Sequence, residues 1–458
     1  MREKLRNDKG FRLIPGLGLL VFYLGFALLD GYGLYPDSQS YIDMAVGREP
    51  LYALYLALFR LCFGGLGESA WLTAAMLGQS VLAAWAGWFF TRRCAALFDL
   101  RRLESAAIAL CTLLPSLMCR FLANRHAMYS TSILSESLAF PLFTVFFIVL
   151  LTWALRGKPK DLLWAALLAL LLYSTRKQMV VTLPLLVLAG LYRGLRARRF
   201  WKTALVSVLL ALTVLLTNQV LDRGYNYALR GEALRHTGDM RFVSTMLLYT
   251  AEEEDAALFS DDDTRELFLE VLDAADKKEY RQRYAPSDWF GRSLYFMNVY
   301  DGIQYLCLRD TIEARAAERF GDDALAMVLE KDRVYGAINA ALLPVSAGRL
   351  VGVVLDSFLV GLVSTVLAQR RLFTLPALLL YAVFIVLLVL NIRRKREVEA
   401  AFGALTLLSI LGNVALVSLT IFCQARYTLY NMPMFYAGAF LLLRGVLPKK
   451  TGVDKNGN

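Results

Sequence analysis

The stretch LSESLAFPLFTVFFIVLLTWAL, residues 134–155, decides the fold class. After Glu136 it carries no charge, and it is close to the roughly 20 apolar residues that a helix needs to cross a membrane. Similar stretches recur along the 458 residues, of which 57% are hydrophobic and 19% are charged. Because lipid admits only helices and closed barrels, the sequence predicts an all-α polytopic membrane protein. A soluble globular enzyme, a disordered chain and a fibrous repeat are excluded.

Charge divides the chain into three parts. Residues 222–345 contain 24 acidic and 15 basic residues, whereas the remainder contains 15 acidic and 35 basic residues. We therefore expect a membrane body at 1–221 whose first outer loop covers 35–68, an acidic helical domain at 222–345, and further membrane helices at 346–458. The bases outside the domain lie in short loops between apolar stretches, so the positive-inside rule explains them better than nucleic-acid binding does.

The basic loops also predict an orientation in a cell membrane. If all six basic clusters are cytoplasmic, the spans must come in pairs between them, and ten spans satisfy this condition. Both termini are then cytoplasmic, and the 222–345 domain is extracytoplasmic. The predicted spans are 13–34, 70–91, 104–122, 134–155, 161–175, 179–193, 201–221, 373–391, 401–423 and 431–447.

Two further features concern the acidic domain and its exit. Within the domain, the acids 261–263 predict a helix N-terminus, and 312–326 forms a second helical pattern. After the domain, residues 350–367 are apolar enough for an eleventh span, but Asp356 and the small residues favour a helix at the outer membrane interface.

Ionisable residues are few on the predicted outer side of the membrane body. Such residues are costly at membrane depth and usually mark a functional site. Carboxylates of the first two outer loops face cations of the second, third and last loops. The residues are Asp37, Asp43, Arg48 and Glu49 in the first loop, Arg120, Arg125, His126 and Glu136 in the second, Arg176 and Lys177 in the third, and Arg426 in the last.

Each of these residues also has a purely structural interpretation. Asp37 or Ser38 suits the N-cap of a helix beginning at residue 39, and Glu136 suits the first turn of a helix. Asp43 and Arg48 are expected on a solvated face. The remaining cations, Arg176, Lys177 and Arg426, are also typical of side chains that anchor a protein at the lipid headgroups.

Four segments resemble a known family. PDSQSYIDMA (36–45), REPLYALYLALF (48–59), LSESLAFPLF (134–143) and QARYTLYNMP (424–433) are similar to motifs of the GT-C superfamily of integral-membrane glycosyltransferases. Within that superfamily, the bacterial relatives of protein O-mannosyltransferases and of the lipid A aminoarabinose transferase are the most similar kind. The resemblance in layout covers most of residues 1–220 and 370–447.

The resemblance implies an inverting transfer of a sugar from a polyprenyl-phosphate donor to a glycan, lipid or protein acceptor on the extracytoplasmic face. It makes Asp37 the base and Glu136 its helper, while Arg176, Lys177 and Arg426 hold the donor phosphate. Substrate contacts are expected from Glu49, Arg125 and Tyr427. A divalent cation is a candidate cofactor with unknown ligands, since Ser38 follows Asp37 where such enzymes often have a second acid.

Other functions remain open at this point. A transporter or lipid flippase is expected to place charges in mid-span and to show paired halves. An O-antigen-type polymerase or ligase is expected to have an arginine-rich outer loop. A membrane scaffold would use the acidic domain only to bind a partner. For all of these functions we expect membrane lipids as partners, and for none of them do we expect nucleic acid.

Overall fold

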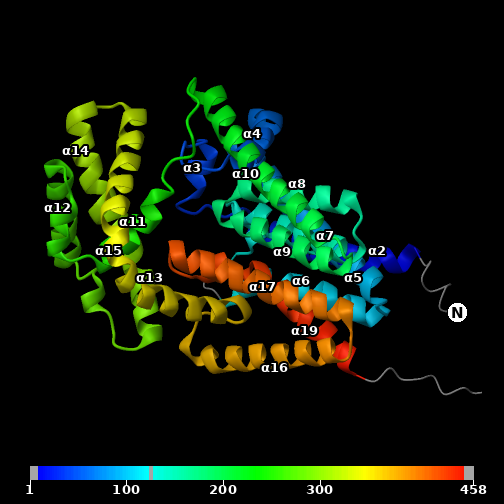
Figure 1. Cartoon of the computed structure of the whole chain (residues 1–458). Helices are drawn as coiled ribbons and strands as arrows, with labels where there is room; N and C mark the ends of the chain where they lie inside the picture. The colour runs from blue at the N-terminus through cyan, green and yellow to red at the C-terminus, as the bar shows by residue number, and fades with distance from the viewer. Residues whose placement is uncertain (1–8, 123–126, 448–458) are drawn as a thin grey trace, which may run out of the picture.

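The computed structural model describes residues 9–122 and 127–447, and these residues are helical with no β-strand among them. The molecule consists of a long helical bundle and a smaller helical domain at one of its ends (Figure 1). Eight helices of the described residues are long and apolar enough to cross a membrane. The all-α membrane architecture predicted from the apolar stretches is thus supported, whereas the number of spans stays a prediction.

Each of the ten predicted spans coincides with a helix of the bundle. Three of them are short: α8 has 17 residues, and α9 and α19 have 15 each. The helices are α2 (Lys9–Asp30), α5 (Glu68–Phe98), α6 (Arg102–Phe121), α7 (Glu136–Arg156), α8 (Pro159–Thr175), α9 (Thr182–Arg196), α10 (Phe200–Arg230), α16 (Thr374–Arg393), α17 (Glu397–Thr420) and α19 (Met432–Val446).

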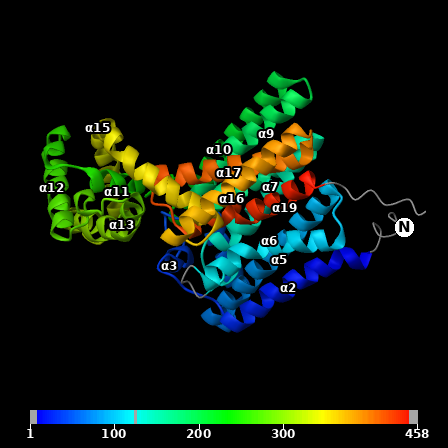
Figure 2. The same ribbon diagram turned by 90° about the horizontal axis from the view of Figure 1, so that it is seen from below.

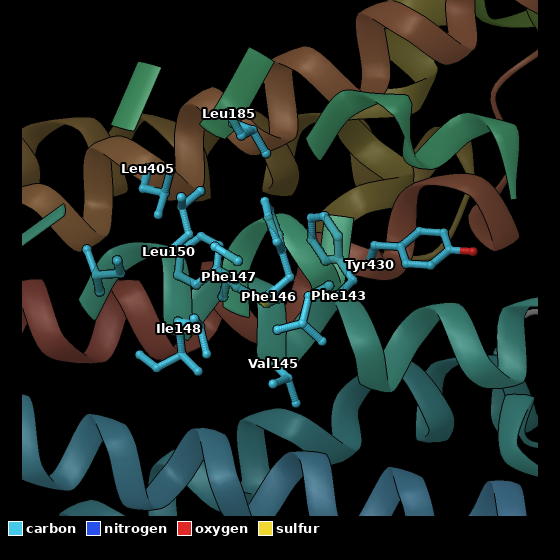
Figure 3. Packing of buried hydrophobic residues seen from close by; sticks show 14 of the residues in the cluster. Phe143, Val145, Phe146, Phe147, Ile148, Leu150, Leu185, Leu405 and Tyr430 are labelled. Carbon is cyan, nitrogen blue, oxygen red and sulfur yellow. The ribbon is translucent and has the colours of Figure 1, made fainter. Parts of the chain in front are cut away.

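Helix α7 forms the centre of the bundle. It is apolar on all sides, and a helix of this kind is stable only when other helices cover it. Phe143, Phe146 and Phe147 are fully buried, and Leu185 of α9 and Leu405 of α17 lie in the same cluster (Figure 3). The opening residue of α7, Glu136, is therefore attached to the most completely packed helix of the molecule.

The basic loops between the helices meet at one end of the bundle. Arg196, the last residue of α9, forms a salt bridge with Glu397 at the start of α17. Near the end of α19, Arg444 pairs with Glu104 of α6 and donates to the carbonyl of Phe98. These contacts join the loop at 197–199 to the loop at 394–396, and the loop at 99–101 to the end of α19; the pairing of spans between basic clusters stays a prediction.

The helical domain lies at the opposite end of the bundle, beside helix α3 (Ser38–Ile42) (Figure 2). Its apolar core includes Phe268, Phe296 and Ile338, which are all buried. Asp261 accepts a hydrogen bond from the Thr264 amide and so caps α12, as the acids at 261–263 predicted. The domain contains α11 (Met240–Thr250), α12 (Asp262–Lys277), α13 (Trp289–Asp301), the π-helix η6 (Gly302–Arg309), α14 (Asp310–Phe320) and the first part of α15 (Ala324–Val366).

Two boundaries differ in detail from the sequence pattern. The helical pattern at 312–326 is divided between α14 and α15, because Gly321 adopts φ +57° and ends α14. Conversely, the predicted boundary between residues 345 and 346 lies inside α15, a continuous helix of 43 residues.

The predicted interfacial segment 350–367 contains the second half of α15. It packs against the bundle, where the Tyr381 hydroxyl of α16 donates to the Leu362 carbonyl and the Tyr436 hydroxyl of α19 donates to the Val366 carbonyl. The position of this segment relative to the bilayer stays a prediction.

Labelling of single cysteines tests the orientation. In a Cys62→Ser background, which removes the one exposed cysteine of the described residues, we expect Ser260→Cys to react with an impermeant maleimide on intact cells. Glu397→Cys lies beside the basic loops and should react only after permeabilisation. Reaction of Glu397→Cys on intact cells would contradict the predicted orientation.

Candidate functional site

The first loop after α2 is attached to the segment that precedes α7. The Gly33 amide donates to the Thr131 carbonyl, and the Ile133 amide donates to the Gly33 carbonyl, each at 2.9 Å. Further along the loop, the Ser38 hydroxyl donates to the Ile133 carbonyl at 2.8 Å. These bonds bring Asp37 close to the start of α7.

Asp37 binds two arginines from different parts of the chain. Arg48 Nη2 lies 2.6 Å from Asp37 Oδ1, and Arg426 Nη2 lies 3.1 Å from Asp37 Oδ2. Although Asp37 directly precedes α3, its side chain makes no capping hydrogen bond. Asp37 thus occupies an N-cap position, as one interpretation predicted, but its side chain does not cap α3, and its carboxylate is oriented instead by the two guanidinium groups.

Glu136 also binds two arginines. Arg176 Nη1 and Arg426 Nε lie 2.8 Å and 3.3 Å from the same oxygen, Glu136 Oε1. Glu136 is the first residue of α7, as predicted for a first-turn acid, and its side chain is 2% exposed. The two carboxylates are thus linked through Arg426, which contacts both.

The five residues form one chain of alternating charge, in the order Arg48, Asp37, Arg426, Glu136, Arg176; we call it the charge chain. Three positive and two negative groups leave it with one positive charge in excess. Burial alone would raise the pKa of the Asp37 carboxyl, but the charges of Arg48 and Arg426 outweigh burial and hold that pKa well below its ordinary value. Asp37 is therefore ionised and weakly basic in this state.

Aromatic and amide side chains hold the arginines in place. The Tyr427 ring lies beneath both Arg176 and Arg426, at 5.0 Å and 4.9 Å from their guanidinium carbons. Arg176 Nε donates to Gln178 Oε1, and Gln178 in turn donates to Asn413 Oδ1 of α17. The third and last loops of the bundle are thereby fixed to one another.

Lys177 points to a different cluster from its neighbour Arg176. Its Nζ lies 2.8 Å from Asp222 Oδ2 at the end of α10, and its backbone amide donates to Glu49 Oε1. Asn218 also donates to Asp222, at 3.3 Å. Glu49 and Lys177 thus form a second polar cluster beside the charge chain.

The structure brings together most of the residues that the sequence singled out. Asp37, Glu136, Arg176 and Arg426 meet with Tyr427, whereas Arg125 and His126 lie outside the described residues. Arg48 was expected on a solvated face, and this expectation is wrong: its side chain is 18% exposed and also bonds Ser40 Oγ at 2.7 Å. Asp43, by contrast, is exposed as expected. The one feature of the sequence that could have indicated the ion pair is that Arg48 follows Asp37 by eleven residues in the same loop.

Within residues 9–122 and 127–447, no group of three or more His, Cys, Asp or Glu side chains could hold a metal ion. The carboxylate oxygens of Asp37 are each bonded to an arginine. The arrangement is thus suited to binding an anion rather than to presenting carboxylates to a cation.

The buried pairing of Glu136 has a measurable consequence. Glu136→Gln leaves Arg176 buried without its carboxylate, so we expect the free energy of unfolding to fall by about 3–5 kcal/mol. The matched control is Glu397→Gln, whose carboxylate is 62% exposed and paired with Arg196; its loss should be about 1 kcal/mol or less. Thermal unfolding in detergent measures both. Equal Tm values for the two variants would show that the charge chain contributes little to stability.

Comparisons with known proteins add no relative: no family model matches the chain, no curated protein matches it, and no solved structure matches it. The resemblance to GT-C glycosyltransferases therefore rests on the four short motifs, each of which contributes one residue to the charge chain.

Proposed function

We propose that this protein is a membrane glycosyltransferase of the GT-C type, which moves a sugar from a polyprenyl-phosphate donor to an acceptor on the extracytoplasmic face. The observation that carries the proposal is the charge chain, in which buried arginines of three loops are gathered around Asp37 and Glu136. Four of its five residues lie in the motifs through which the sequence resembles the GT-C family.

The excess of arginine suits the donor phosphate. Arginine forks match the oxygens of a phosphate group, and their attraction is strongest where water is excluded. Arg176 and Arg426 are 13% and 20% exposed in their side chains, so both are accessible to a ligand yet largely withdrawn from solvent. As the bond from the sugar to the phosphate breaks, these arginines stabilise the charge that develops on the leaving phosphate.

Inversion requires one base. The acceptor oxygen attacks the anomeric carbon, the bond to the phosphate oxygen breaks, and the hydroxyl proton passes to a carboxylate. We assign this role to Asp37. Glu136 is too deeply buried to meet the acceptor, so its role is to position Arg176 and Arg426 through their ion pairs.

Asp37 becomes a better base when the donor arrives. Its two arginine partners lower its proton affinity, and a donor phosphate competes for the same guanidinium groups. When an arginine binds the phosphate in place of Asp37, the pKa of the Asp37 carboxyl rises. Donor binding and base strength are therefore coupled through Arg48 and Arg426.

The position of the charges favours an enzyme over a transporter or flippase. A transporter is expected to hold its ligand near mid-membrane, between broken helices. Here Asp37, Arg48 and Arg426 lie in connections between the long helices, and Glu136 is the first residue of its helix. The acidic domain at this end of the bundle is also unlike the arginine-rich outer loop expected of the alternative enzyme, an O-antigen-type polymerase or ligase.

Asp37→Asn tests the base. Asparagine keeps the shape of the side chain but cannot accept the proton, so we expect single-turnover sugar transfer to slow by about 10²–10⁴-fold. The measurement is transfer of radiolabelled sugar from lipid-linked donors in membranes. The matched control is Asp43→Asn, since Asp43 lies in the same loop and contacts only Gln39 there; it should retain its rate. Transfer within a few-fold of wild type in Asp37→Asn would remove Asp37 as the base.

Neighbouring cations provide a second test. Arg176 lies in the charge chain and Lys177 pairs with Asp222, so the two should differ in donor binding. Arg176→Gln should weaken the binding of polyprenyl phosphate by about 1.5–3 kcal/mol, as for loss of a charge-assisted hydrogen bond. Lys177→Gln should leave this affinity unchanged. Equal losses in both variants would mean that Lys177 belongs to the phosphate site, as the sequence predicted.

A further inference from the structure

The helical domain reaches the charge chain through a row of aromatic rings. Tyr300, near the end of α13, packs edge-on against Phe422 at 5.0 Å between ring centroids. Phe422 lies 6.2 Å from Tyr427, and the guanidinium of Arg426 lies over the Tyr427 ring. The end of α13 is therefore packed on the loop that supplies Arg426, and Asp301 follows Tyr300 directly.

The backbone after Asp301 has an unusual form. Residues Gly302–Arg309 form a π-helix, which is rare in proteins and often occurs at functional sites. Gly302 packs against the Tyr280 ring, so a side chain at this position would clash. Asp301 directly precedes the π-helix and Tyr305 lies within it, so both residues are close in sequence to Tyr300 of the aromatic row.

Two charged groups of this surface are not engaged in salt bridges. Every arginine of the domain from Arg265 to Arg349 forms a salt bridge with a carboxylate. Arg241 forms none with the described residues, and its Nε is buried without a hydrogen-bond partner there. For Asp301, the described part of the chain likewise provides no ion pair. Arg241 is half-buried and its guanidinium carbon lies 4.8 Å from the Phe242 ring, so the group is held in place and able to bind an anion.

The Tyr300 hydroxyl donates to the Phe242 carbonyl at 3.2 Å, so Arg241 on α11 lies beside the end of α13 and the aromatic row. Burial raises the pKa of the Asp301 carboxyl; the charge of Asp37 raises it further, and Arg426 and Arg241 oppose the rise. Burial likewise raises the pKa of the Tyr305 phenol, and Arg241, Asp37, Asp301 and Arg48 all act on it. The electrostatic coupling runs across the space between domain and bundle, consistent with the aromatic row.

We propose that Arg241, Asp301 and Tyr305 form the acceptor subsite of the proposed transferase, and that the acceptor carries an anionic group close to its reacting hydroxyl. Arg241 binds the anion, while Asp301 and Tyr305 hold neighbouring hydroxyl groups and direct the reacting one toward Asp37. This inference rests on the proposed function, since it places the acceptor opposite the donor phosphate. The net negative charge of the domain does not prevent an anionic acceptor from binding. Most carboxylates near the arginines of the domain are paired, and charges beyond about 8 Å are screened at physiological salt.

Two hollows lie elsewhere in the domain and are less suited to this role. One, of about 710 Å³, is lined by Asp261, Asp263, Arg319 and Arg333, and another, of about 360 Å³, is lined by Arg235 and Asp332. Neither is lined by a residue of the charge chain. Arg319 and Arg333 already pair with carboxylates, so the larger hollow offers less to an anionic ligand than Arg241 does.

Binding to purified full-length protein tests the subsite. The probes are an oligomer of glycerol phosphate, which combines hydroxyl and anionic groups, and a neutral oligoglycerol of equal length. We expect the anionic oligomer to bind at least tenfold more tightly, and Arg241→Gln to lose about tenfold or more of this affinity. Asp301→Asn should weaken the binding of both oligomers. The matched control is Arg235→Gln, an exposed arginine of the same region, which should change neither.

Wild-type affinity of Arg241→Gln for the anionic oligomer, or equal binding of the two oligomers to wild-type protein, would overturn the subsite. Polyprenyl phosphate binding to the same samples reports separately on the proposed function. If polyprenyl phosphate fails to bind while the oligomer results hold, the donor assignment is wrong and the anion site stands. If polyprenyl phosphate binds and Arg241→Gln has no effect, the acceptor subsite alone fails. Thermal unfolding of each variant identifies any that is misfolded, in which case Arg241→Lys, which keeps the charge and loses the fork, replaces Arg241→Gln.

Discussion

The buried carboxylate of Glu136 is the constraint on which the site depends. One of its oxygens contacts both Arg176 and Arg426, and Arg426 in turn contacts Asp37. Charges withdrawn from water are stable only when they are paired. The loops that carry these residues are far apart in the sequence, so their convergence is required by charge pairing as much as by apolar packing. Removing Glu136 leaves Arg176 without its carboxylate partner in the charge chain, and removing Asp37 does the same to Arg48.

The bundle gives this constraint a rigid support. Glu136 opens α7, whose apolar side chains are covered on all sides, and the Gly33 bridge attaches the first loop to the residues before it. Gln178 bonds Asn413 of α17 and the Tyr427 carbonyl, which ties the third loop to the last. The functional groups thus lie on connecting segments, but each segment is fixed to a packed helix.

Apolar patterning was sufficient to predict the helices, because each buried or lipid-facing helix needs a long uncharged stretch. Asp37, Glu136, Arg176 and Arg426 were predicted because charge is scarce on that side of the bundle. Arg48 was named in the same loop but placed on a solvated face, because its contact with Asp37 depends on the α3 turn that folds it back. Likewise, adjacency in sequence suggested that Arg176 and Lys177 act together, whereas a change of direction between them sends Lys177 to Asp222. Pairings between distant segments depend on tertiary structure and leave no local signature.

Under the proposed function, the charge chain also sets an order of events. Without the donor, Asp37 is held ionised by two arginines and has little affinity for a proton, so an acceptor that arrives first finds no effective base. A single negative phosphate balances the one positive charge in excess and competes for the guanidinium groups that restrain Asp37. Base strength then rises only when the leaving group is in place. An acceptor held by the helical domain would meet an active base only in the complex that contains both substrates, so the same ion pairs that stabilise the loops would favour binding of the donor before reaction of the acceptor.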